Sequence, residues 1–464
     1  MTLIKSISGI RGTVGGAVGK SLSPFDIVKY VSSYAAFIKL CNSQSKTMVI
    51  GRDARVSGDM VSRIVSGTLM SLGFDVIDVG LSTTPSIEVA VVLQKADGGI
   101  IITASHNPIN WNALKLLNSK GEFLSQEDGE EILSIAEKNE FIFSQSENIG
   151  NYIFDNSFND KHIDKVLNLK FVNLPLIKES KFKVVIDGVN SSGGFMIPKL
   201  LDRLGVDYVK LYCDPNGLFP HNPEPLEENL TEISKLVVST GSDFGIVVDP
   251  DVDRLALVCH DGSMFGEEYT LVAVADYVLS KNPGNTVSNL SSTRALKDIT
   301  EKYNCKYEAS AVGEVNVVEK MKQINAVIGG EGNGGIIYPE IHYGRDALVG
   351  IVLILSLLAD KQITLKELKE LYPKYYMSKN KIQLTNSINI DSILSNLKDK
   401  YSSENITTID GLKIDFNDGW VHLRKSNTEP IIRIYSESIS EKKANHLSES
   451  IINDIKQFLI WMFT

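Results

Sequence analysis

A serine and a group of aspartates are the residues of this sequence best placed to do chemistry. Ser105 lies in Thr-Ala-Ser-His-Asn-Pro (103–108), directly after the apolar run 99–102. That run predicts a strand, and open α/β sheets build their sites at the carboxyl ends of strands. A serine hydroxyl is a weak nucleophile without a base or prior covalent activation, and His106 and Lys115 are the titratable side chains nearby. On its own, the hexapeptide is better explained as a polar turn that Pro108 ends.

Three aspartates at alternate positions follow the next strand-like run, 245–248. They are Asp249, Asp251 and Asp253. Alternate side chains of an extended segment point the same way, so we expect the three carboxylates to converge. Crowded carboxylates need a cation, and oxygen ligands suit Mg²⁺. An EF-hand is excluded because Arg254 and His260 stand where its glycine and glutamate belong. The spacing favours a divalent metal site over a solvated acidic turn.

A glycine-rich loop, Gly-Gly-Glu-Gly-Asn-Gly-Gly (329–335), follows the apolar run 326–328. Glycines permit close backbone approach, and Glu331 and Asn333 could hydrogen-bond vicinal hydroxyls, which indicates sugar recognition. No Gly-Lys-Ser/Thr follows, so the loop is not a Walker A phosphate loop. A glycine-rich loop alone is weak support, because many such loops are simply turns.

A basic and hydroxyl-rich segment lies near the C-terminus. It reads Arg-Lys-Ser-Asn-Thr-Glu-Pro (424–430), and Arg433 follows closely. Guanidinium groups bind phosphate through a planar fork, and hydroxyls with backbone N–H groups can complete the cradle. We therefore expect this segment to hold a substrate phosphate that does not react.

The composition is typical of an acidic, folded enzyme. The chain has 464 residues, of which 43% are hydrophobic and 22% charged, and this length predicts three or four domains. The net charge of -10 argues against a nucleic-acid partner. No run approaches the ~20 apolar residues of a membrane span, and the N-terminus lacks the pattern of a signal peptide. The four widely spaced cysteines suggest neither a zinc site nor a disulfide framework, so we expect a cytoplasmic protein.

Short apolar runs alternate with amphipathic stretches, as in βαβ units. In the first part of the chain we expect strands at 47–50, 74–77 and 99–102 and a helix over 60–72. The pattern restarts with a strand at 183–186 and a helix over 195–204, where Leu-Gly-Val-Asp (204–207) repeats Leu-Gly-Phe-Asp (72–75). A third pass has strands at 286–290 and near 306–308 and a helix over 294–303. Three related α/β units follow from this pattern.

The character of the chain changes after residue 373. We expect a helix rich in Lys and Asn, short strands near 412–414 and 420–423, and a terminal helix from Glu441 whose last residues pack on their own domain. The predicted domains are therefore three α/β domains over 1–150, 151–257 and 258–372, with mixed sheets, and a smaller α+β domain over 373–464.

Taken together, five motifs in this order resemble the α-D-phosphohexomutase family. They are S-I-S-G-I-R-G (6–12), T-A-S-H-N-P (103–108), D-P-D-V-D-R (249–254), G-E-G-N-G-G (330–335) and R-K-S-N-T-E-P (424–430). The resemblance spans essentially the whole chain. It implies three similar α/β domains and a smaller fourth domain around a central cleft.

The resemblance also implies roles for individual residues. Ser105 would be the phosphoserine, and its phosphate would hold one Mg²⁺ together with Asp249, Asp251 and Asp253. Arg11 and Arg254 would lie beside the reacting phosphoryl group. Lys115, ten residues beyond the serine, and His106 are the candidates for proton transfer. The residues expected to bind the sugar and its distal phosphate are Glu331, Asn333, Arg424, Ser426, Asn427, Thr428 and Arg433.

The implied reaction transfers phosphate from Ser105 to a hexose monophosphate and gives a bound hexose 1,6-bisphosphate. The sugar then turns over and returns its other phosphate to Ser105, which exchanges positions 1 and 6. The bisphosphate would therefore be both an intermediate and an activator. A small sugar phosphate is the expected partner, with no nucleic acid and no membrane, and the chain would be a monomer or a homodimer.

Departures from the family pattern bear on the substrate. Many glucose- and mannose-directed members have G-E-x-S-G-H in the sugar loop, whereas here Asn333 replaces the serine and Gly335 the histidine. This form of the loop, followed by His-Tyr-Gly-Arg-Asp (342–346), is more similar to the archaeal-type phosphoglucosamine mutases. We therefore favour glucosamine phosphate as the substrate. The 103–108 and 249–254 motifs also suit phosphomannomutase/phosphoglucomutase members.

Two other classes of function remain open. Residues 246–252 also fit the strand-D-x-D pattern of haloacid-dehalogenase-like phosphatases, in which Asp249 would be the phosphorylated nucleophile. A catalytically silent sugar-phosphate-binding protein is the third reading. The presence of Ser105, Lys115 and all three aspartates weighs against it.

Overall fold

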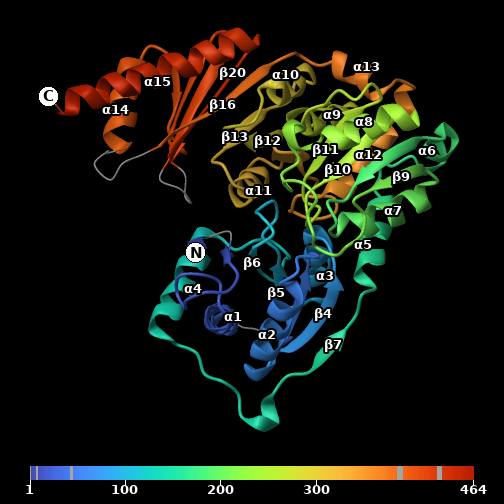
Figure 1. The fold of residues 1–464 in the computed structure, drawn as a ribbon, viewed down its shortest axis with the longest axis vertical. Helices are drawn as coiled ribbons and strands as arrows, with labels where there is room; N and C mark the ends of the chain where they lie inside the picture. The colour runs from blue at the N-terminus through green and yellow to red at the C-terminus, as the bar shows by residue number, and fades with distance from the viewer. Residues whose placement is uncertain (1, 7–8, 42–44, 384–389, 426–430, 464) are drawn as a thin grey trace. The chain divides into compact units, whose positions relative to one another are not determined.

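A computed structural model describes the chain except for residues 1, 7–8, 42–44, 384–389, 426–430 and 464. The described chain forms two compact units. Unit 1 comprises residues 1–281 and 333–369, and unit 2 comprises residues 282–332 and 370–464. Figure 1 shows the elements of both units along the chain.

The N-terminal sheet of unit 1 is mixed and has seven strands in the order β1-β2-β6-β5-β3-β4-β7. The strands β5, β3, β4 and β7 are parallel to one another. Strand β6 lies between β5 and β2 and runs antiparallel to both. The strands are β1 (Leu3–Ser6), β2 (Gly9–Thr13), β3 (Thr47–Arg52), β4 (Asp75–Leu81), β5 (Gly98–Ile102), β6 (Trp111–Leu117) and β7 (Tyr152–Phe154).

Helices bury both faces of this sheet. Along β3, Met48 and Ile50 pack into one apolar cluster and Val49 into another, because alternate side chains point to opposite faces. The first cluster includes residues of the helices α1 (Pro24–Leu40), α2 (Gly58–Ser71) and α4 (Gln126–Lys138); the second includes residues of α3 (Thr84–Gln94) and α5 (Phe158–Leu167). Strands buried on both faces explain why the sequence shows continuous apolar runs here.

The second sheet, also in unit 1, has the order β11-β10-β8-β9. Strands β10 and β9 run parallel to β8, and β11 returns antiparallel to β10. The elements are α6 (Leu174–Ser180), β8 (Lys183–Asp187), α7 (Gly193–Leu204), β9 (Asp207–Leu211), α8 (Thr231–Thr240), β10 (Phe244–Val248) and β11 (Leu255–Cys259).

The predicted repeat between the two sheets is confirmed. In each copy a helix ends, a glycine with positive φ follows (+84° at Gly73, +67° at Gly205), and a parallel strand begins at the aspartate. Glycine adopts the left-handed backbone conformation at little cost in free energy, so glycine is the residue expected at this turn.

The third α/β region is divided between the units. In unit 2, β12 (Thr286–Asn289) pairs in parallel with β13 (Tyr307–Ser310) and with β14 (Ile328–Glu331), and the helices are α10 (Ala295–Lys302) and α11 (Glu314–Gln323). In unit 1, α9 (Glu267–Lys281) packs against α12 (Ala347–Lys361). The other elements of this stretch in unit 1 are β15 (Gly335–Ile337) and α13 (Leu365–Glu370).

The C-terminal domain, in unit 2, is an antiparallel sheet in the order β16-β20-β19-β18-β17 with two helices. Its elements are β16 (Tyr376–Gln383), α14 (Ile390–Lys400), β17 (Asn405–Thr407), β18 (Leu412–Phe416), β19 (Gly419–Lys425), β20 (Ile431–Ser438) and α15 (Glu441–Phe463). The fold class predicted from the sequence, three α/β domains with mixed sheets and a smaller α+β domain, is confirmed.

One prediction for this domain is wrong. The stretch after residue 373 begins with β16 and not with a helix, and the Lys- and Asn-containing helix α14 comes only later. Strand β16 lies at the edge of the sheet and pairs with β20 along its whole length. An edge strand tolerates many polar side chains, so its sequence lacks the apolar run that marks the buried strands.

Two other predictions concern the whole chain. All four cysteines are free thiols. Among the helices that the structure describes, none is both long enough and apolar enough to cross a membrane.

Candidate active site

The serine loop begins where β5 ends, and a buried arginine holds it. Ser105 adopts a left-handed backbone conformation with φ of +47°. Arg55, 1% exposed, donates hydrogen bonds of 2.5–3.0 Å to the backbone carbonyls of Ser105, Asn107, Pro108 and Trp111. A single guanidinium therefore fixes the loop in its strained conformation.

Asp53 keeps that arginine in place. The Asp53 carboxylate lies 3.1 Å from Arg55 Nε and accepts a 2.6 Å hydrogen bond from the Thr103 hydroxyl. Asp53 and Arg55 follow β3, which pairs in parallel with β5. The sequence analysis missed both residues, although an acidic and a basic side chain directly after a buried strand were a signal that could have found them.

The three aspartates converge as expected, but for a different reason. Ligand oxygens of Asp249, Asp251 and Asp253 lie within 4.8 Å of one another, and all three side chains are buried. The segment is a turn after β10 and not an extended strand, and Val252 in its middle has φ of +62°. The turn, and not the alternation of a strand, brings the carboxylates together.

Ser105 contacts the loop 249–254, which we call the aspartate loop, directly. Ser105 Oγ donates a 2.7 Å hydrogen bond to Asp249 Oδ2. Lys115 Nζ lies 2.7 Å from Asp251 Oδ2 and 3.5 Å from Asp253 Oδ2. Thr84, the first residue of α3, donates a further 2.6 Å hydrogen bond from its hydroxyl to Asp251 Oδ2. The nucleophile and the acidic group predicted from separate motifs therefore share one site.

The ionisation of the loop reflects this crowding. Burial, and then the charges of Asp253 and Asp251, raise the pKa of Asp249 well above its usual range. Burial alone would also raise the pKa of Asp251, but Lys115 outweighs it, so this pKa is lowered. Burial opposes the charged form of Lys115, yet the two carboxylates raise its pKa above the ordinary value. The raised pKa of Asp249 means that burial and the crowding of the carboxylates outweigh the nearby charge of Arg254.

The aspartate loop fits a divalent cation. Asp251 Oδ1 and Asp253 Oδ1 are buried and have no hydrogen-bond partner among the residues that the structure describes. A buried, unpaired carboxylate oxygen costs free energy, and a cation removes that cost. Three carboxylates within reach of one point match the hard oxygen ligands of such an ion.

Three further predicted residues surround the serine. Arg11 lies on β2 opposite Ala113, two residues from Lys115 on β6. His106 Nδ1 is 3.3 Å from Ser105 Oγ. Arg254 lies beside the loop, with Nε 3.9 Å from Asp253 Oδ1 and Nη1 3.6 Å from Glu224 Oε1.

The nearby arginines affect the pKa of His106, the residue that follows Ser105. Burial and then the nearby charges of Arg254, Arg11 and Arg345 lower the pKa of His106 well below its usual value. Burial, and then the charge of Arg254, lower the pKa of Arg11. Such a group of cations suits an anionic substrate group such as phosphate.

The predicted sugar-binding residues belong to different units. Glu331, in unit 2, ends β14 and accepts hydrogen bonds from Asn289 Nδ2 at 2.9 Å and from Gly313 N at 3.2 Å. Asn333, in unit 1, accepts a 3.2 Å hydrogen bond from Gly335 N.

The predicted distal phosphate residues are described only in part. Arg424 on β19 lies directly opposite Arg433 on β20, and both belong to unit 2. Arg433 Nη1 contacts the Tyr435 hydroxyl at 3.5 Å. Ser426, Asn427 and Thr428 lie outside the described residues.

A second buried cluster, which the sequence analysis missed, lies in unit 1. We call His162, His342, Asp346 and Glu88 the histidine cluster. Asp346 Oδ2 lies 2.8 Å from His162 Nε2 and 3.3 Å from His342 Nε2, while His342 Nδ1 lies 2.9 Å from Glu88 Oε2. His162 Nδ1 completes the set with Ser86 Oγ at 2.8 Å.

The histidine cluster holds a strongly basic imidazole. Burial alone would lower the pKa of His342, but its hydrogen bonds to Asp346 and Glu88 prevail and raise the pKa to about 10. Asp346 also caps α12 by accepting hydrogen bonds from Leu348 N and Val349 N. The imidazole of His342 therefore lies between two carboxylates of the cluster.

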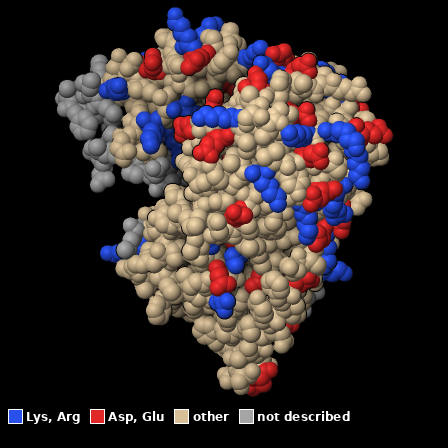
Figure 2. All heavy atoms as spheres, turned by 45° about the vertical axis from the view of Figure 1, so that its right-hand side comes forward, with Lys and Arg blue, Asp and Glu red and all other residues tan. Residues whose placement is uncertain are grey.

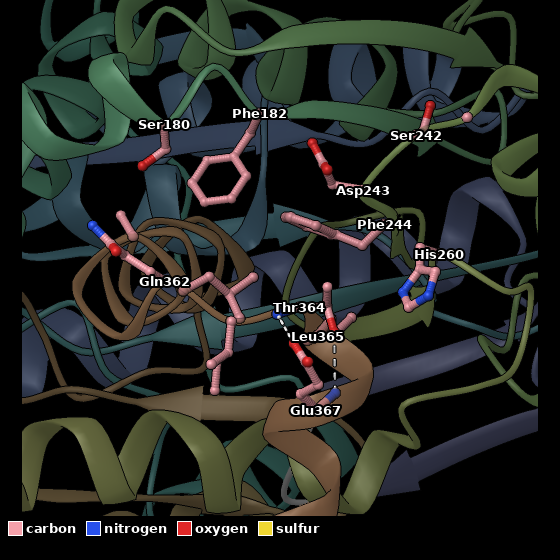
Figure 3. Close-up of a pocket in the computed structure, with 14 residues that line it drawn as sticks. Ser180, Phe182, Ser242, Asp243, Phe244, His260, Gln362, Thr364, Leu365 and Glu367 are labelled. Carbon is pink, nitrogen blue, oxygen red and sulfur yellow. Dashed lines mark hydrogen bonds between the residues drawn. The ribbon is translucent and has the colours of Figure 1, made fainter.

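Outside these clusters, Figure 2 shows basic and acidic side chains interspersed on the face in view. Unit 1 also contains a cavity of ≈ 620 Å³ where α8, β10 and the end of α12 approach one another, and Figure 3 shows the side chains that line it. Phe182 and Phe244 meet edge to face there, with ring centroids 6.3 Å apart. None of the predicted site residues lines this cavity.

Family models match nearly the whole chain. The three phosphoglucomutase/phosphomannomutase alpha/beta/alpha domains I, II and III match residues 3–143, 160–262 and 266–375, and the C-terminal domain of the same family matches residues 357–453. The chain therefore belongs to the phosphoglucomutase/phosphomannomutase family, a group of phosphosugar mutases within the α-D-phosphohexomutases, and it is an isomerase.

Individual relatives carry two kinds of name. A phosphoglucomutase/phosphomannomutase of Thermococcus kodakarensis is 35% identical over 97% of this chain and 98% of its own length. A phosphoglucosamine/phosphogalactosamine mutase of Sulfurisphaera tokodaii is 32% identical over 96% of this chain and 97% of its own length. A solved phosphoglucomutase/phosphomannomutase family protein from Burkholderia thailandensis superposes with a TM-score of 0.85, 24% identity and coverage of 98% and 97%, which supports the fold.

Proposed function

We propose that this mutase interconverts a hexose 6-phosphate and the corresponding hexose 1-phosphate through a phosphoserine at Ser105. The observation that carries the proposal is the 2.7 Å hydrogen bond between Ser105 Oγ and Asp249 within a group of three buried carboxylates. A nucleophilic hydroxyl and a cation site in one place are what a reversible phosphoryl transfer requires.

In the proposed cycle, a hydroxyl oxygen of the sugar phosphate attacks the phosphorus of phosphorylated Ser105. The P–O bond to Ser105 breaks, the hydroxyl proton passes to a base, and a hexose 1,6-bisphosphate is bound. The sugar reorients, and Ser105 Oγ takes the other phosphate by the reverse steps. A bound Mg²⁺ would offset charge on the transferring phosphate oxygens.

The side chains around Ser105 have distinct proposed roles. Arg11 and Arg254 stabilise charge on the transferring group, because guanidinium groups bind phosphate oxygens in a fixed geometry. Lys115 and His106 are the two candidates for moving the proton. His106 Nδ1 lies 3.3 Å from Ser105 Oγ, and Lys115 Nζ lies 2.7 Å from Asp251 Oδ2.

The remaining predicted residues would bind the non-reacting end of the substrate. Glu331 and Asn333 would hold sugar hydroxyls, and the distal phosphate would lie on Arg424, Ser426, Asn427, Thr428 and Arg433. The corresponding domains are proposed to be 1–150 for the phosphoserine, 151–257 for the metal, 258–372 for the sugar and 373–464 for the distal phosphate.

Glucosamine phosphate is the proposed substrate. The G-G-E-G-N-G-G loop and the phosphoglucosamine/phosphogalactosamine mutase among the relatives support it. The Thermococcus relative supports a phosphomannomutase/phosphoglucomutase with the same mechanism instead. Turnover of glucosamine, glucose and mannose phosphates, measured side by side, would decide between them, and equal or higher kcat/KM for glucose or mannose phosphate would reject glucosamine phosphate.

The mechanism is tested with Ser105→Ala. We expect this variant to lose mutase activity by a factor of at least about 10³ when assayed with a trace of hexose 1,6-bisphosphate, because the proposed cycle passes the phosphoryl group through the Ser105 hydroxyl. Ser119→Ala, which changes an exposed serine of the same domain, is the matched control and should keep full activity. Undiminished turnover in Ser105→Ala would reject the proposal.

The phosphorylated residue separates a mutase from a phosphatase. After incubation with ³²P-labelled bisphosphate, we expect an acid-stable label on Ser105 and no net release of phosphate. A hydroxylamine-labile label on Asp249, together with free phosphate, would instead identify a phosphatase that uses this aspartate as its nucleophile.

A further inference from the structure

One arginine that no motif predicted reaches the aspartate loop. Arg345 Nη2 donates a 2.7 Å hydrogen bond to Asp253 Oδ2, and the arginine side chain is only 9% exposed. Arg345 lies between β15 and α12, more than ninety residues from Asp253 in the sequence. A buried guanidinium bound to a carboxylate oxygen determines how that carboxylate can turn.

Gly335 leaves the space through which Arg345 reaches the loop. A Cβ atom at this position would lie 2.3 Å from Arg345 Cδ and 3.0 Å from Cγ, far closer than van der Waals contact allows. Gly335 is not among the glycines with positive φ, so its backbone conformation is open to any residue. Space for the arginine, and not backbone conformation, is therefore what requires glycine here. This is also the position at which many family members have the histidine of G-E-x-S-G-H.

The backbone on both sides of Arg345 is anchored. Asp346 N donates to Ile336 O at 2.8 Å, and Ala347 N donates to Val252 O in the aspartate loop at 3.2 Å. Gly344 packs so closely that a Cβ there would lie 1.9 Å from Glu88 Oε2 of the histidine cluster. The backbone of Arg345 is therefore held in place, and its side chain binds the aspartate loop, to which the neighbouring residue Ala347 is already hydrogen-bonded.

These contacts leave Asp253 with one oxygen for a cation. Oδ2 is engaged by Arg345 at 2.7 Å and lies 3.5 Å from Lys115 Nζ. Oδ1 is buried and lies 3.9 Å from Arg254 Nε, and in the described part of the chain it has no hydrogen-bond partner. We propose that Arg345 is a positioning residue that restricts Asp253 to a single ligand oxygen and thereby makes the site prefer Mg²⁺ over Ca²⁺. This inference rests on the proposed cation site.

The physical reason lies in the different coordination of the two ions. Mg²⁺ requires a compact octahedron and uses few carboxylate oxygens, whereas Ca²⁺ accepts six to eight oxygens and binds carboxylates through both oxygens readily. A carboxylate that cannot offer its second oxygen therefore disfavours Ca²⁺. Releasing Oδ2 of Asp253 would remove that restriction.

The test is direct calorimetric titration of Mg²⁺ and Ca²⁺ into the full-length protein without substrate. We expect Arg345→Ala to lower the ratio of Mg²⁺ to Ca²⁺ affinity by about 10-fold, in the range seen when groups that orient metal ligands are removed. Arg345→Lys keeps the charge and one donor, so it should recover part of the ratio. In turnover assays at saturating Mg²⁺, kcat of Arg345→Ala should fall by about 10-fold or more while KM for the sugar phosphate stays within about 3-fold.

Gly335→Ala provides a second variant that keeps the arginine. Its added methyl group should displace Arg345 and reproduce the loss of selectivity. The double variant Gly335→Ala/Arg345→Ala should then lower the ratio of Mg²⁺ to Ca²⁺ affinity no further than either single variant does. Gly67→Ala is the matched control, because a Cβ at Gly67 in α2 meets no atom within 4 Å. Arg203→Ala, at an exposed ion pair with Asp164, controls for the loss of one positive charge.

The outcomes separate this inference from the proposed function. If the wild-type protein binds neither ion, the proposed cation site itself is wrong. If it binds Mg²⁺ but Arg345→Ala and Gly335→Ala keep the wild-type ratio of affinities, the role of Arg345 is rejected. An unchanged ratio in Gly335→Ala alone, with the loss seen in Arg345→Ala, would reject the steric role of the glycine.

Discussion

The aspartate loop and the histidine cluster are both buried groups of metal-ligating side chains in unit 1, yet they differ in which side chains lie next to their carboxylate oxygens. In the histidine cluster, each of the four imidazole nitrogens lies 2.8–3.3 Å from an oxygen. In the aspartate loop, two carboxylate oxygens have no hydrogen-bond partner within the described chain. His342 Nδ1 and Glu88 Oε2 of the histidine cluster, although 2.9 Å apart, do not meet hydrogen-bond geometry either. An unsatisfied atom alone therefore does not indicate a ligand site, and the comparison depends on which side chains lie next to the carboxylate oxygens.

The two clusters also differ in charge. In the aspartate loop, three carboxylates lie next to Lys115 and Arg345, and Arg254 Nε lies 3.9 Å from Asp253 Oδ1. In the histidine cluster, two acids face two imidazoles, of which His342 is held in its protonated form. We therefore expect the aspartate loop to bind a cation and the histidine cluster to stabilise the fold.

The largest expected effect is that of Asp249→Asn. This nearly isosteric change removes one charge, so Mg²⁺ should no longer raise the Tm, and turnover should fall by at least about 10³-fold. For the wild-type protein, Mg²⁺ at 100 times its Kd should raise the free energy of unfolding by about 2.7 kcal/mol.

Without metal, the Tm of Asp249→Asn should be no lower than that of the wild type, since carboxylate repulsion is relieved. The control is Asp261→Asn, which changes an exposed carboxylate beyond β11. A clear increase in the Tm of Asp249→Asn on adding Mg²⁺ would show that the loop does not hold the ion.

Asp346→Ala should have the second largest effect, on stability. It removes the partner of both histidines and the cap of α12, and breaking a buried ion pair typically costs about 3–5 kcal/mol. We expect the Tm, measured by calorimetry, to fall by at least about 6 °C.

Mg²⁺ should still raise the Tm of this variant, because the three ligand carboxylates remain. Asp360→Ala, which breaks an exposed ion pair with Lys281, is the control and should change the Tm little. A drop in Asp346→Ala no larger than that in the control would contradict the stabilising role of the histidine cluster.

The smallest expected effect is on the pH dependence of stability. The pKa of His342 is raised from 6.5 to about 10 in the folded protein. Its contribution to stability is therefore complete below about pH 6.5 and is lost as the pH rises through about 10. The Tm of the wild type should fall over this range by more than that of His342→Gln, and the corresponding difference in the free energy of unfolding should be at least about 2 kcal/mol.

Asp346 does not interfere with this measurement, because its lowered pKa confines its own titration to acid. His446→Gln, at an exposed position of α15, should follow the wild type. Parallel Tm curves for the wild type and His342→Gln between pH 6.5 and 10 would contradict the prediction.

The sequence was sufficient to predict the elements that a local pattern of apolar residues determines. Strands buried on both faces gave continuous apolar runs, so β3, β5, β8 and β10 were found, and with them the loops at their carboxyl ends. The polar edge strand β16 was missed because nothing buries its side chains on both faces. The turn at Val252 was missed because alternate aspartates are equally compatible with an extended segment.

The supporting residues of the site could not be predicted in the same way. Arg55, Arg345 and Asp346 contact residues that are about fifty to nearly two hundred positions away in the sequence. Only the folded chain brings them together, and no spacing rule connects them. Gly335 gave a partial signal, because its departure from the family pattern marks the place that Arg345 fills.

Several hydrogen bonds join the N-terminal sheet region to the second sheet region near the site. Thr84 binds Asp251 through both its backbone and its hydroxyl, Ser192 Oγ donates to Ser82 O, and Ala54 N donates to Ser191 Oγ. Separating the two regions would break all of these bonds. The proposed phosphoryl donor and the proposed cation site therefore lie in regions that these hydrogen bonds hold together, and in the proposed cycle the sugar is the part that reorients.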